Sequence, residues 1–257
     1  MNGKVFLVGA GPGDPELLTV KALRLLQTAD VVLHDDLVAS EILKLIPSTT
    51  QVQNVGKRCG TKTMRQEEIN FLMVTLAASG LKVVRLKSGD PLIFGRAGEE
   101  IEALRRSNVA YEIVPGVTSA LGAAAAAGIP LTHRQTSSTI VLSAGHRASE
   151  NSDVEWSQAA GSESTLVVYM PGHDYAGIAC RLKASGFADE TPCAIISRAT
   201  TPHQQMHLTT ISNLGHSPHL ASPTLLVVGE VVRFADHAEE NLSVHFEIPV
   251  RPEERLA

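Results

Sequence analysis

The chain has few of the residues that cross-link small secreted proteins or stack on nucleic-acid bases. Of its 257 residues, three are cysteines and 4% are aromatic. The cysteines are Cys59, Cys180 and Cys193, an odd number without C-x-x-C spacing. We therefore expect neither a disulfide framework nor a thiolate zinc site, and a reducing cytoplasm fits. The low aromatic content argues against base stacking as a main binding mode.

Long runs of one residue class are also missing. No run of Lys and Arg exceeds two residues, and the formal net charge is -5, so a surface that binds nucleic-acid phosphates is not expected. No apolar run reaches the ~18 residues that a membrane span needs. The first residues, 1–4, lead directly into an apolar segment and do not resemble a signal peptide. These absences predict a cytoplasmic protein with no membrane or nucleic-acid partner.

What the chain does contain is enough apolar material for a large core. Hydrophobic residues make up 44% of the sequence, and the length suggests one large domain or two modest ones. In the first half, short apolar runs alternate with segments of helical periodicity. Expected strands are 5–8, 31–33, 52–55, 83–86 and 111–114, and expected helices are 17–26, 42–46, 66–79 and 98–106. Strands separated by helices need crossover connections, which predicts an α/β fold with a mostly parallel sheet.

The second half predicts a different sheet. Expected strands are 139–142, 165–169, 194–197, 205–209 and 224–228. The connection between Ser197 and Gln205 is too short for a crossover helix, so these two strands should be antiparallel and the second sheet mixed. The alanine run 123–127 predicts a closely packed helix that ends at Gly128 and Pro130. We place a domain boundary near Pro115, giving α/β domains over 1–115 and 116–238 and a loosely held tail over 239–257.

A glycine-rich loop, Gly9–Pro15, follows the first strand and allows several interpretations. It approaches the dinucleotide fingerprint G-x-G-x-x-G, with Asp35 or Asp36 as the acid for a ribose. Asp14, however, stands at the third glycine position, where its charge would repel a pyrophosphate. A second interpretation is a rigid turn that contacts a smaller nucleoside ligand, with Asp14 capping a helix. A plain tight turn is the third.

Several segments together resemble the tetrapyrrole methylases, and among them the branch that methylates uroporphyrinogen III. The similarity is carried by the loop Val8–Thr19 and by the segments 83–100, 114–120 and 128–134, with weaker matches at 55–58, 168–170, 199–202 and 222–230. It runs from about residue 4 to residue 233, and its specificity lies in the order and spacing of so many segments. No single segment would suffice.

The resemblance implies a fold and an activity. The family has two α/β domains with an active site in the cleft between them, and it works as a homodimer. Its members transfer methyl groups from S-adenosyl-L-methionine to carbons 2 and 7 of uroporphyrinogen III. The products are precorrin-2, which feeds sirohaem and cobalamin synthesis, and S-adenosyl-L-homocysteine. No metal is implied. The sequence has no His-Glu-x-x-His motif, and His203 and His207 would not converge on a strand.

The resemblance also implies which residues bind the methyl donor. The implied donor-binding residues are Pro12, Ser88, Gly89, Asp90, Ile93, Thr118, Ser119, Met170 and Ala199. Thr118 and Ser119 stand near an expected helix start, where free N–H groups can meet a carboxylate. Helix capping is the alternative for these two residues. For Met170 the alternative is core filling.

For the acceptor, the resemblance implies binding by Arg96, Glu99, Met170 and Arg134, the last also with a catalytic role. Arginine suits this task because its planar fork binds carboxylates through two bonds. A surface pair between Arg96 and Glu99 is the alternative. Asp35 and Lys57 match positions proposed as proton acceptor and proton donor, since a methylated ring carbon must eventually lose a proton. The alternatives are a turn residue for Asp35 and a solvated lysine for Lys57.

The sequence departs from the family at one charged position. Where the family has Tyr-Asp-Arg-Leu-Val, this chain has His34 to Val38, with Asp36 replacing the arginine. Ser88 and Ala97 replace glycines, and both are small. Three other functions therefore stay open: methylation of another tetrapyrrole, an NAD-dependent oxidoreductase, and a binding module that has lost catalysis.

Overall fold

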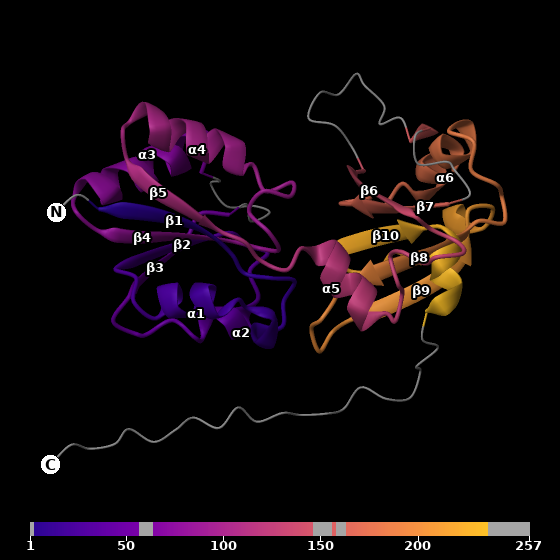
Figure 1. Ribbon diagram of the computed structural model, residues 1–257, viewed down its shortest axis with the longest axis horizontal. Coiled ribbons are helices and arrows are strands. Elements are labelled where there is room, and N and C mark those ends of the chain that lie inside the picture. Colours follow the sequence, from indigo (N-terminus) through magenta and orange to yellow (C-terminus); the bar gives the residue numbers. More distant parts are fainter. Residues whose placement is uncertain (1–2, 57–63, 146–155, 158–162, 236–257) are drawn as a thin grey trace, which may run out of the picture.

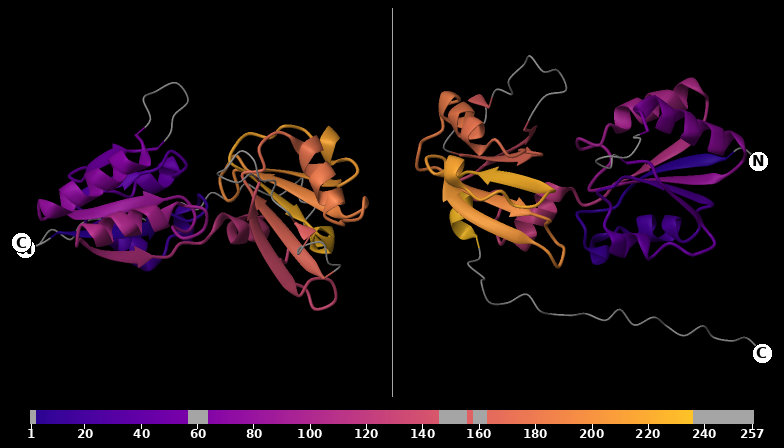
Figure 2. Two further views of the ribbon diagram at one scale, coloured as in Figure 1. Left: turned by 90° about the horizontal axis from the view of Figure 1, so that it is seen from above. Right: turned by 180° about the vertical axis from the view of Figure 1, so that it is seen from behind.

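A computed structural model describes residues 3–56, 64–145, 156–157 and 163–235. Two five-stranded sheets lie in two lobes (Figure 1), and the two further views in Figure 2 show the same separation. The α/β class expected from the sequence is confirmed. The strands are β1 (Lys4–Gly9), β2 (Val31–His34), β3 (Gln51–Asn54), β4 (Lys82–Lys87), β5 (Ala110–Val114), β6 (Thr139–Ala144), β7 (Ser164–Tyr169), β8 (Pro192–Ser197), β9 (Gln205–Thr210) and β10 (Thr224–Val228). The α-helices are α1 (Val20–Leu26), α2 (Ser40–Leu43), α3 (Gln66–Ala78), α4 (Ala97–Arg106), α5 (Ser119–Ala126) and α6 (Tyr175–Ala184).

The first sheet has the order β3-β2-β4-β1-β5, and all of its neighbouring strands are parallel. The prediction of a mostly parallel sheet is therefore confirmed. Because the strands run the same way, the loops after β1, β2, β4 and β5 all leave from one edge. Ligands bind at this carboxyl edge in open α/β sheets.

Both faces of the first sheet are buried, which explains its continuous apolar strands. Successive side chains of a strand point to opposite faces. Leu7 and Val83 pack with α3 and α4 on one face, while Val8 and Val84 pack with α1 and α2 on the other (Figure 1). On β4, Arg85 and Lys87 share the face of Val83, toward α4.

The second sheet has the order β6-β7-β10-β8-β9 and is mixed. β6 and β7 are parallel, whereas the β7–β10, β10–β8 and β8–β9 pairs are antiparallel. Ser197 stands opposite Gln205 in the β8–β9 pair. The short connection between these two residues thus gives the antiparallel pair that the sequence predicts.

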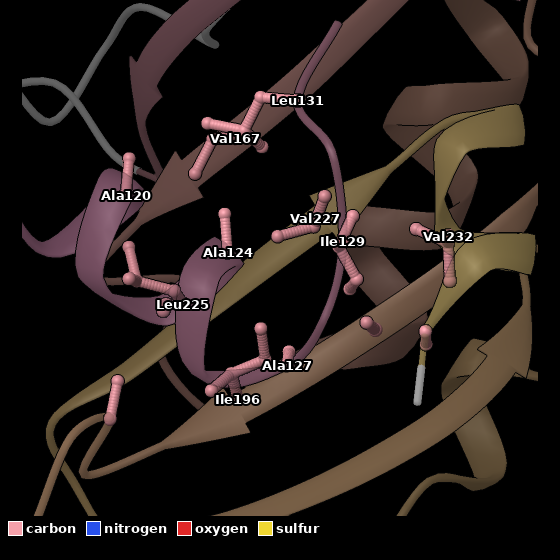
Figure 3. Close-up of a cluster of buried hydrophobic side chains, with 14 of the residues drawn as sticks. Ala120, Ala124, Ala127, Ile129, Leu131, Val167, Ile196, Leu225, Val227 and Val232 are labelled. Carbon is pink, nitrogen blue, oxygen red and sulfur yellow. The ribbon is translucent and has the colours of Figure 1, made fainter. Parts of the chain in front are cut away.

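Small residues let α5 pack closely on the second sheet. Ala120, Ala124 and Ala127 lie against β-sheet residues such as Val227 (Figure 3). The other face of this sheet is covered by α6, which packs there with Trp156. The predicted alanine-rich helix is confirmed, although it begins at Ser119, earlier than the alanine run.

Two predictions about helices are wrong. Two other predictions, one about a residue and one about the tail, concern parts of the chain outside the described residues. The expected helix 17–26 is split into a 3₁₀ turn, Pro15–Leu17, and α1, because Thr19 caps α1 by accepting a hydrogen bond from the Ala22 N–H. The sequence prediction also missed α6. Lys57 and the tail 239–257 are outside the described part of the chain. Among the helices in that part, none has the length and apolar character needed to cross a bilayer.

Candidate active site

Three loops meet through their backbones at the carboxyl edge of the first sheet. Gly11 and Gly89 exchange two backbone hydrogen bonds, of 3.2 and 2.8 Å. Gly9 and Gly116 approach so closely that a Cβ on Gly9 would lie 2.5 Å from the Gly116 nitrogen. A Cβ on Gly116 would lie 2.3 Å from the Gly89 oxygen. Gly9, Gly11, Gly89 and Gly116 are here called the glycine junction. Gly9 and Gly116 require glycine because the backbones touch, whereas Gly11 and Gly89 have φ of 73° and 67°, which favours glycine.

The glycine junction carries most of the predicted donor-binding residues of the first lobe. Pro12 follows Gly11, and Ser88, Gly89 and Asp90 follow β4. The Asp90 carboxylate accepts from the Gly116 N–H at 3.1 Å and from the Leu92 N–H at 2.8 Å. Both of its oxygens therefore hold loop backbone in place.

Contacts from the second lobe reach the same loops. The Asp14 N–H donates to Thr200 Oγ1 at 3.2 Å. A Cβ on Gly122 of α5 would lie 2.5 Å from Pro12 Cγ, so the helix backbone lies directly on that proline. The rings of Phe94 and Tyr169 are 4.8 Å apart. The predicted residues Pro12 and Ala199, the latter next to Thr200, are thus brought to one region.

Tyr169 fixes the start of α5. Its hydroxyl shares a hydrogen bond of 2.6 Å with the Thr118 hydroxyl and accepts from the Ala120 N–H at 3.1 Å. Thr118 is the N-cap residue, yet its own side chain makes no capping hydrogen bond. A Cβ on Gly89 would lie 3.4 Å from Ser119 Oγ. The predicted pair Thr118 and Ser119 therefore stands at a helix N-terminus beside the glycine junction.

Strained backbone gathers in the loops of this region. Phe94, Met170 and Thr200 have φ of 52°, 50° and 63°, a region that side-chain-bearing residues rarely occupy. Such strain concentrates at functional sites, where the surrounding structure enforces it. Met170 is 46% exposed, so it is not filling the core. Ile93, by contrast, packs against the hydrophobic cluster beneath α5.

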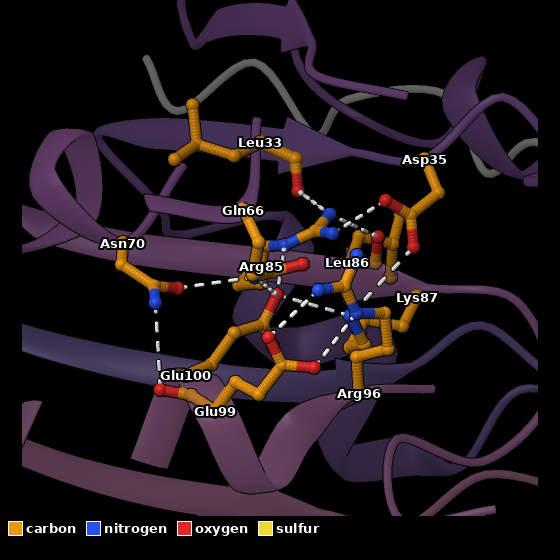
Figure 4. Close-up of polar contacts among 10 residues, drawn as sticks. All are labelled: Leu33, Asp35, Gln66, Asn70, Arg85, Leu86, Lys87, Arg96, Glu99 and Glu100. Carbon is orange, nitrogen blue, oxygen red and sulfur yellow. Dashed lines mark hydrogen bonds and ion pairs between the residues drawn. The ribbon is translucent and has the colours of Figure 1, made fainter. Parts of the chain in front are cut away.

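A second group of predicted residues surrounds a set of buried charges (Figure 4). Asp35, directly after β2, pairs with Arg85 Nη2 and lies 3.8 Å from Lys87 Nζ. Glu100 of α4 accepts from Arg85 Nε at 2.9 Å and from Lys87 Nζ at 3.0 Å. Arg85, Lys87 and Glu100 are at most 3% exposed, whereas Asp35 is 29% exposed. Burial lowers the pKa of the Lys87 ammonium, and the charge of Arg85 lowers it further.

Arg96 and Glu99 form a bidentate pair at the start of α4. Arg96 Nε and Nη2 donate to the two Glu99 oxygens at 2.8 and 2.7 Å (Figure 4). This hydrogen bonding raises the pKa of Arg96 and lowers the pKa of Glu99. Both side chains are about half exposed, as the surface-pair alternative predicts. The pair nevertheless lies beside Lys87 and Glu100. A carboxylate of an acceptor could there replace the Glu99 carboxylate as the partner of the Arg96 guanidinium.

One residue with a predicted role is not joined to these groups, and another cannot be placed. Arg134 lies in an exposed turn closed by hydrogen bonds between His133 and Ser137. Lys57 lies outside the described residues. Asp36, which replaces the family's arginine, accepts from Asn54 Nδ2 at 2.5 Å. Within the ranges that the structure describes, no three His, Cys, Asp or Glu side chains gather as metal ligands would.

The structure adds five residues to the site that the motifs did not single out: Arg85, Lys87, Glu100, Tyr169 and Thr200. One signal for the first two was present in the sequence. Arg85 and Lys87 interrupt an apolar strand that the topology places at the centre of a sheet, where unpaired charges are rarely buried.

Comparisons with known proteins agree on one family. The family model described as tetrapyrrole (corrin/porphyrin) methylases matches residues 4–215. A siroheme synthase 1 of Yersinia enterocolitica is 49% identical over 232 residues, which are 90% of this chain and 49% of that protein. A siroheme synthase of Neisseria meningitidis is 48% identical, over 90% of this chain and 48% of its own length. The chain thus spans about half the length of these relatives.

Solved structures match over nearly their whole length. The uroporphyrin-III C-methyltransferase of Thermus thermophilus, solved in its native form and with S-adenosylhomocysteine, is 40% identical, with a TM-score of 0.79. The match covers 90% of this chain and 99% of that one. A cobalt precorrin-4 methyltransferase of cobalamin biosynthesis is 32% identical with a TM-score of 0.78, over 89% of this chain and 95% of its own.

Proposed function

The chain belongs to the tetrapyrrole methylase family, and we propose that it transfers methyl groups from S-adenosyl-L-methionine to uroporphyrinogen III. The observation that carries the proposal is the glycine junction with α5 and Tyr169 against it. We assign donor binding to Pro12, Ser88–Asp90, Ile93, Thr118, Ser119, Met170 and Ala199. A structure solved with S-adenosylhomocysteine shares this fold at 40% identity and a TM-score of 0.79, which supports this assignment.

The residues present fit such a donor. Bound there, the donor would supply a methyl group activated by a sulfonium centre. The N–H groups at the start of α5 suit its carboxylate, because a helix N-terminus favours negative charge. Exposed Met170 and Phe94 offer apolar surface, and the convergence of two lobes supports water exclusion.

The same loops argue against a dinucleotide. Asp14 caps the 3₁₀ turn Pro15–Leu17 by accepting from the Glu16 N–H at 2.8 Å. Its carboxylate therefore takes the place where a pyrophosphate would need N–H donors. α1 begins later, at Val20, after its own cap.

For the acceptor, we propose that Arg96 and Arg134 bind carboxylates and that Glu99 and Met170 flank the ring. Asp35 accepts the proton that the methylated ring carbon releases, and Lys57 serves as proton donor. Placement dominates such a displacement, since the reacting atoms must approach in line. Asp35 is partly exposed and the Arg96–Glu99 pair is half exposed, and both lie around the buried charges of Arg85, Lys87 and Glu100 (Figure 4), which supports this arrangement.

Anaerobic incubation with uroporphyrinogen III and labelled S-adenosyl-L-methionine tests the proposal. We expect two labelled methyl groups per macrocycle and a red-shifted product. A second incubation offers cobalt precorrin-4, the acceptor named for the other solved structure. If the chain methylates cobalt precorrin-4 and not uroporphyrinogen III, our assignment of the acceptor is wrong. Asp35→Asn should abolish turnover and keep affinity for S-adenosylhomocysteine, whereas Asp189→Asn, an exposed matched control paired with Lys183, should change neither.

We further propose that the chain acts in the cytoplasm as a homodimer, with the domain boundary at Pro115 and the product used for sirohaem or cobalamin. The thiols of Cys180 and Cys193 are free, which suits a reducing compartment. Light scattering on the purified chain tests the dimer, and a monomeric mass would contradict it. Limited proteolysis near Pro115 tests the boundary.

A further inference from the structure

Four ionisable side chains meet where β2 and β4 end, and three of them are buried. We propose that Arg85, Lys87 and Glu100 form a charge frame that positions Asp35 and sets the pH range in which Asp35 accepts the ring proton. This inference rests on the proposed function, because it concerns the same proton. The three residues are positioning residues, since Asp35 alone of the four is open to solvent.

The frame holds each oxygen of Asp35 from one strand. Arg85 and Lys87 stand two residues apart on β4, so their side chains leave the same face. Arg85 Nη2 binds Asp35 Oδ1, and Lys87 Nζ lies 3.8 Å from Oδ2 (Figure 4). The Asp35 N–H donates to the Leu86 oxygen at 3.3 Å. Three contacts with one strand thus fix both the position and the rotation of the carboxylate.

Glu100 holds the two cations from the opposite side. Its Oε1 accepts from Arg85, from Lys87 and, at 3.4 Å, from Gln66 Nε2 of α3. Its Oε2 is buried without a hydrogen-bond partner among the described residues. Glu100 therefore competes with Asp35 for the same two cations, and it weakens their electrostatic attraction to Asp35.

The frame is balanced in charge only while Asp35 is ionised. Two cations then face two carboxylates. When Asp35 takes up a proton, one positive charge stays uncompensated in a low-dielectric interior, which is costly. The frame thus favours passing the proton on from Asp35 after each transfer, and a change in the charges of the frame should change the pH dependence of turnover.

Other charged groups lie near the frame on the Asp35 segment and on α4. On the Asp35 segment itself, His34 Nδ1 lies 3.0 Å from the Asp35 backbone oxygen, and Asp36 contacts Asn54 of β3. On α4, Arg96 and Glu99 satisfy each other. None of these side chains is paired with Asp35 in the contacts described above. Among the described residues, Arg85 and Lys87 are therefore the cations that contact its carboxylate.

Two substitutions should move the acidic limb of the kcat–pH profile in opposite directions. Lys87→Met removes a cation and keeps an apolar stem, so the limb should move up by about one pH unit. Glu100→Gln removes the competing anion with one atom changed, so the limb should move down. Lys82→Met, on the same strand but paired with Thr28 at the other end, is the matched control and should leave the limb in place.

The outcomes separate this inference from the proposed function. Calorimetry with S-adenosylhomocysteine should give affinities within about twofold of wild type for all three variants, which shows that they fold. If wild type methylates, Asp35→Asn does not, and neither frame variant moves the limb, the inference is wrong. If Asp35→Asn keeps its kcat, the proposed role of Asp35 is wrong instead. If Lys87→Met and Glu100→Gln moved the acidic limb in the same direction, the inference would also be wrong. Opposite shifts are expected only when the charges of the two residues act on Asp35, and not when the residues serve the fold alone.

Discussion

At the scale of single residues, Tyr169 connects more of the site than any motif residue does. Its hydroxyl bonds the N-cap Thr118 and the Ala120 N–H, and its ring contacts Phe94 of the other lobe. It is 8% exposed, so water cannot easily replace a lost bond. One side chain therefore determines where the helix N-terminus points.

Tyr169→Phe should weaken both the fold and donor binding. Loss of the hydroxyl leaves the Ala120 N–H unpaired, which costs about 1–2 kcal/mol of unfolding free energy. We expect affinity for S-adenosylhomocysteine to fall about fivefold or more, because the helix start loosens. Urea unfolding and calorimetry measure the two effects.

Tyr111→Phe is the matched control for this prediction. The Tyr111 hydroxyl accepts from Arg105 Nε at 2.8 Å on the surface of the first lobe. Its loss should cost at most about 0.5 kcal/mol and leave donor affinity unchanged. Equal effects of the two substitutions on donor affinity would contradict a positioning role for Tyr169.

The sequence predicts residues of this site unevenly. Gly11 and Gly89 stand in recognisable loops, since their positive φ favours glycine there. Arg85 and Lys87 interrupt an apolar strand, but the sequence alone does not show what would pair with them. Their burial depends on Glu100, which a sequence pattern cannot pair with them across the fold. The role of Tyr169 was not predicted either, because its partners Thr118 and Ala120 follow β5, far from Tyr169 in the sequence.

At the scale of elements, α4 begins with a strained residue. Arg96 is its N-cap and has φ of 55°, the left-handed region, which costs a side-chain-bearing residue roughly 1 kcal/mol. The Arg96–Glu99 pair that accompanies it is about half exposed and returns little stability. This strain agrees with the role outside folding that we propose for Arg96, namely the binding of an acceptor carboxylate.

Replacing Arg96 with two small residues should separate strain from function. Arg96→Gly should raise the unfolding free energy relative to Arg96→Ala by about 1 kcal/mol, because glycine relieves the strain. Both variants should lose acceptor binding alike, seen as an equal rise in KM. Urea unfolding and the methylation assay measure these quantities. If the alanine variant kept the wild-type KM, the carboxylate-binding role of Arg96 would be wrong.

Elements were predictable where a local signal is strong. All ten strands appear within about two residues of their predicted bounds, since short apolar runs between turn residues leave few alternatives. The first helix was misplaced because Leu17 and Leu18 continue the apolar period across a boundary that Thr19 sets. α6 was missed because its apolar positions, including Ile178 and Leu182, are interrupted by polar and small residues.

At the scale of the whole molecule, the two lobes touch through small contacts at the candidate site. They include Pro12 on Gly122, the Asp14 N–H on Thr200, and Phe94 on Tyr169. Every one involves a loop at the carboxyl edge of the first sheet. The placement of the lobes and the shape of the donor site are therefore determined by the same residues, and a change at one contact should affect both.

Gly122→Ala should disturb that placement, although it favours the helix. Alanine in place of a helical glycine normally adds about 1 kcal/mol of stability. Here the new Cβ would lie 2.5 and 2.7 Å from two Pro12 carbons, so α5 and the Pro12 loop must separate. We expect no gain in stability and about a tenfold loss of S-adenosylhomocysteine affinity by calorimetry.

Gly98→Ala isolates the helix effect from the contact between lobes. Gly98 lies in α4, and a Cβ there would have nothing within 4 Å. This variant should gain about 0.5–1 kcal/mol in urea unfolding and keep its donor affinity. If Gly122→Ala gained as much and bound the donor as well as wild type, α5 would not need to lie on Pro12. The two lobes would then hold their donor site without that contact.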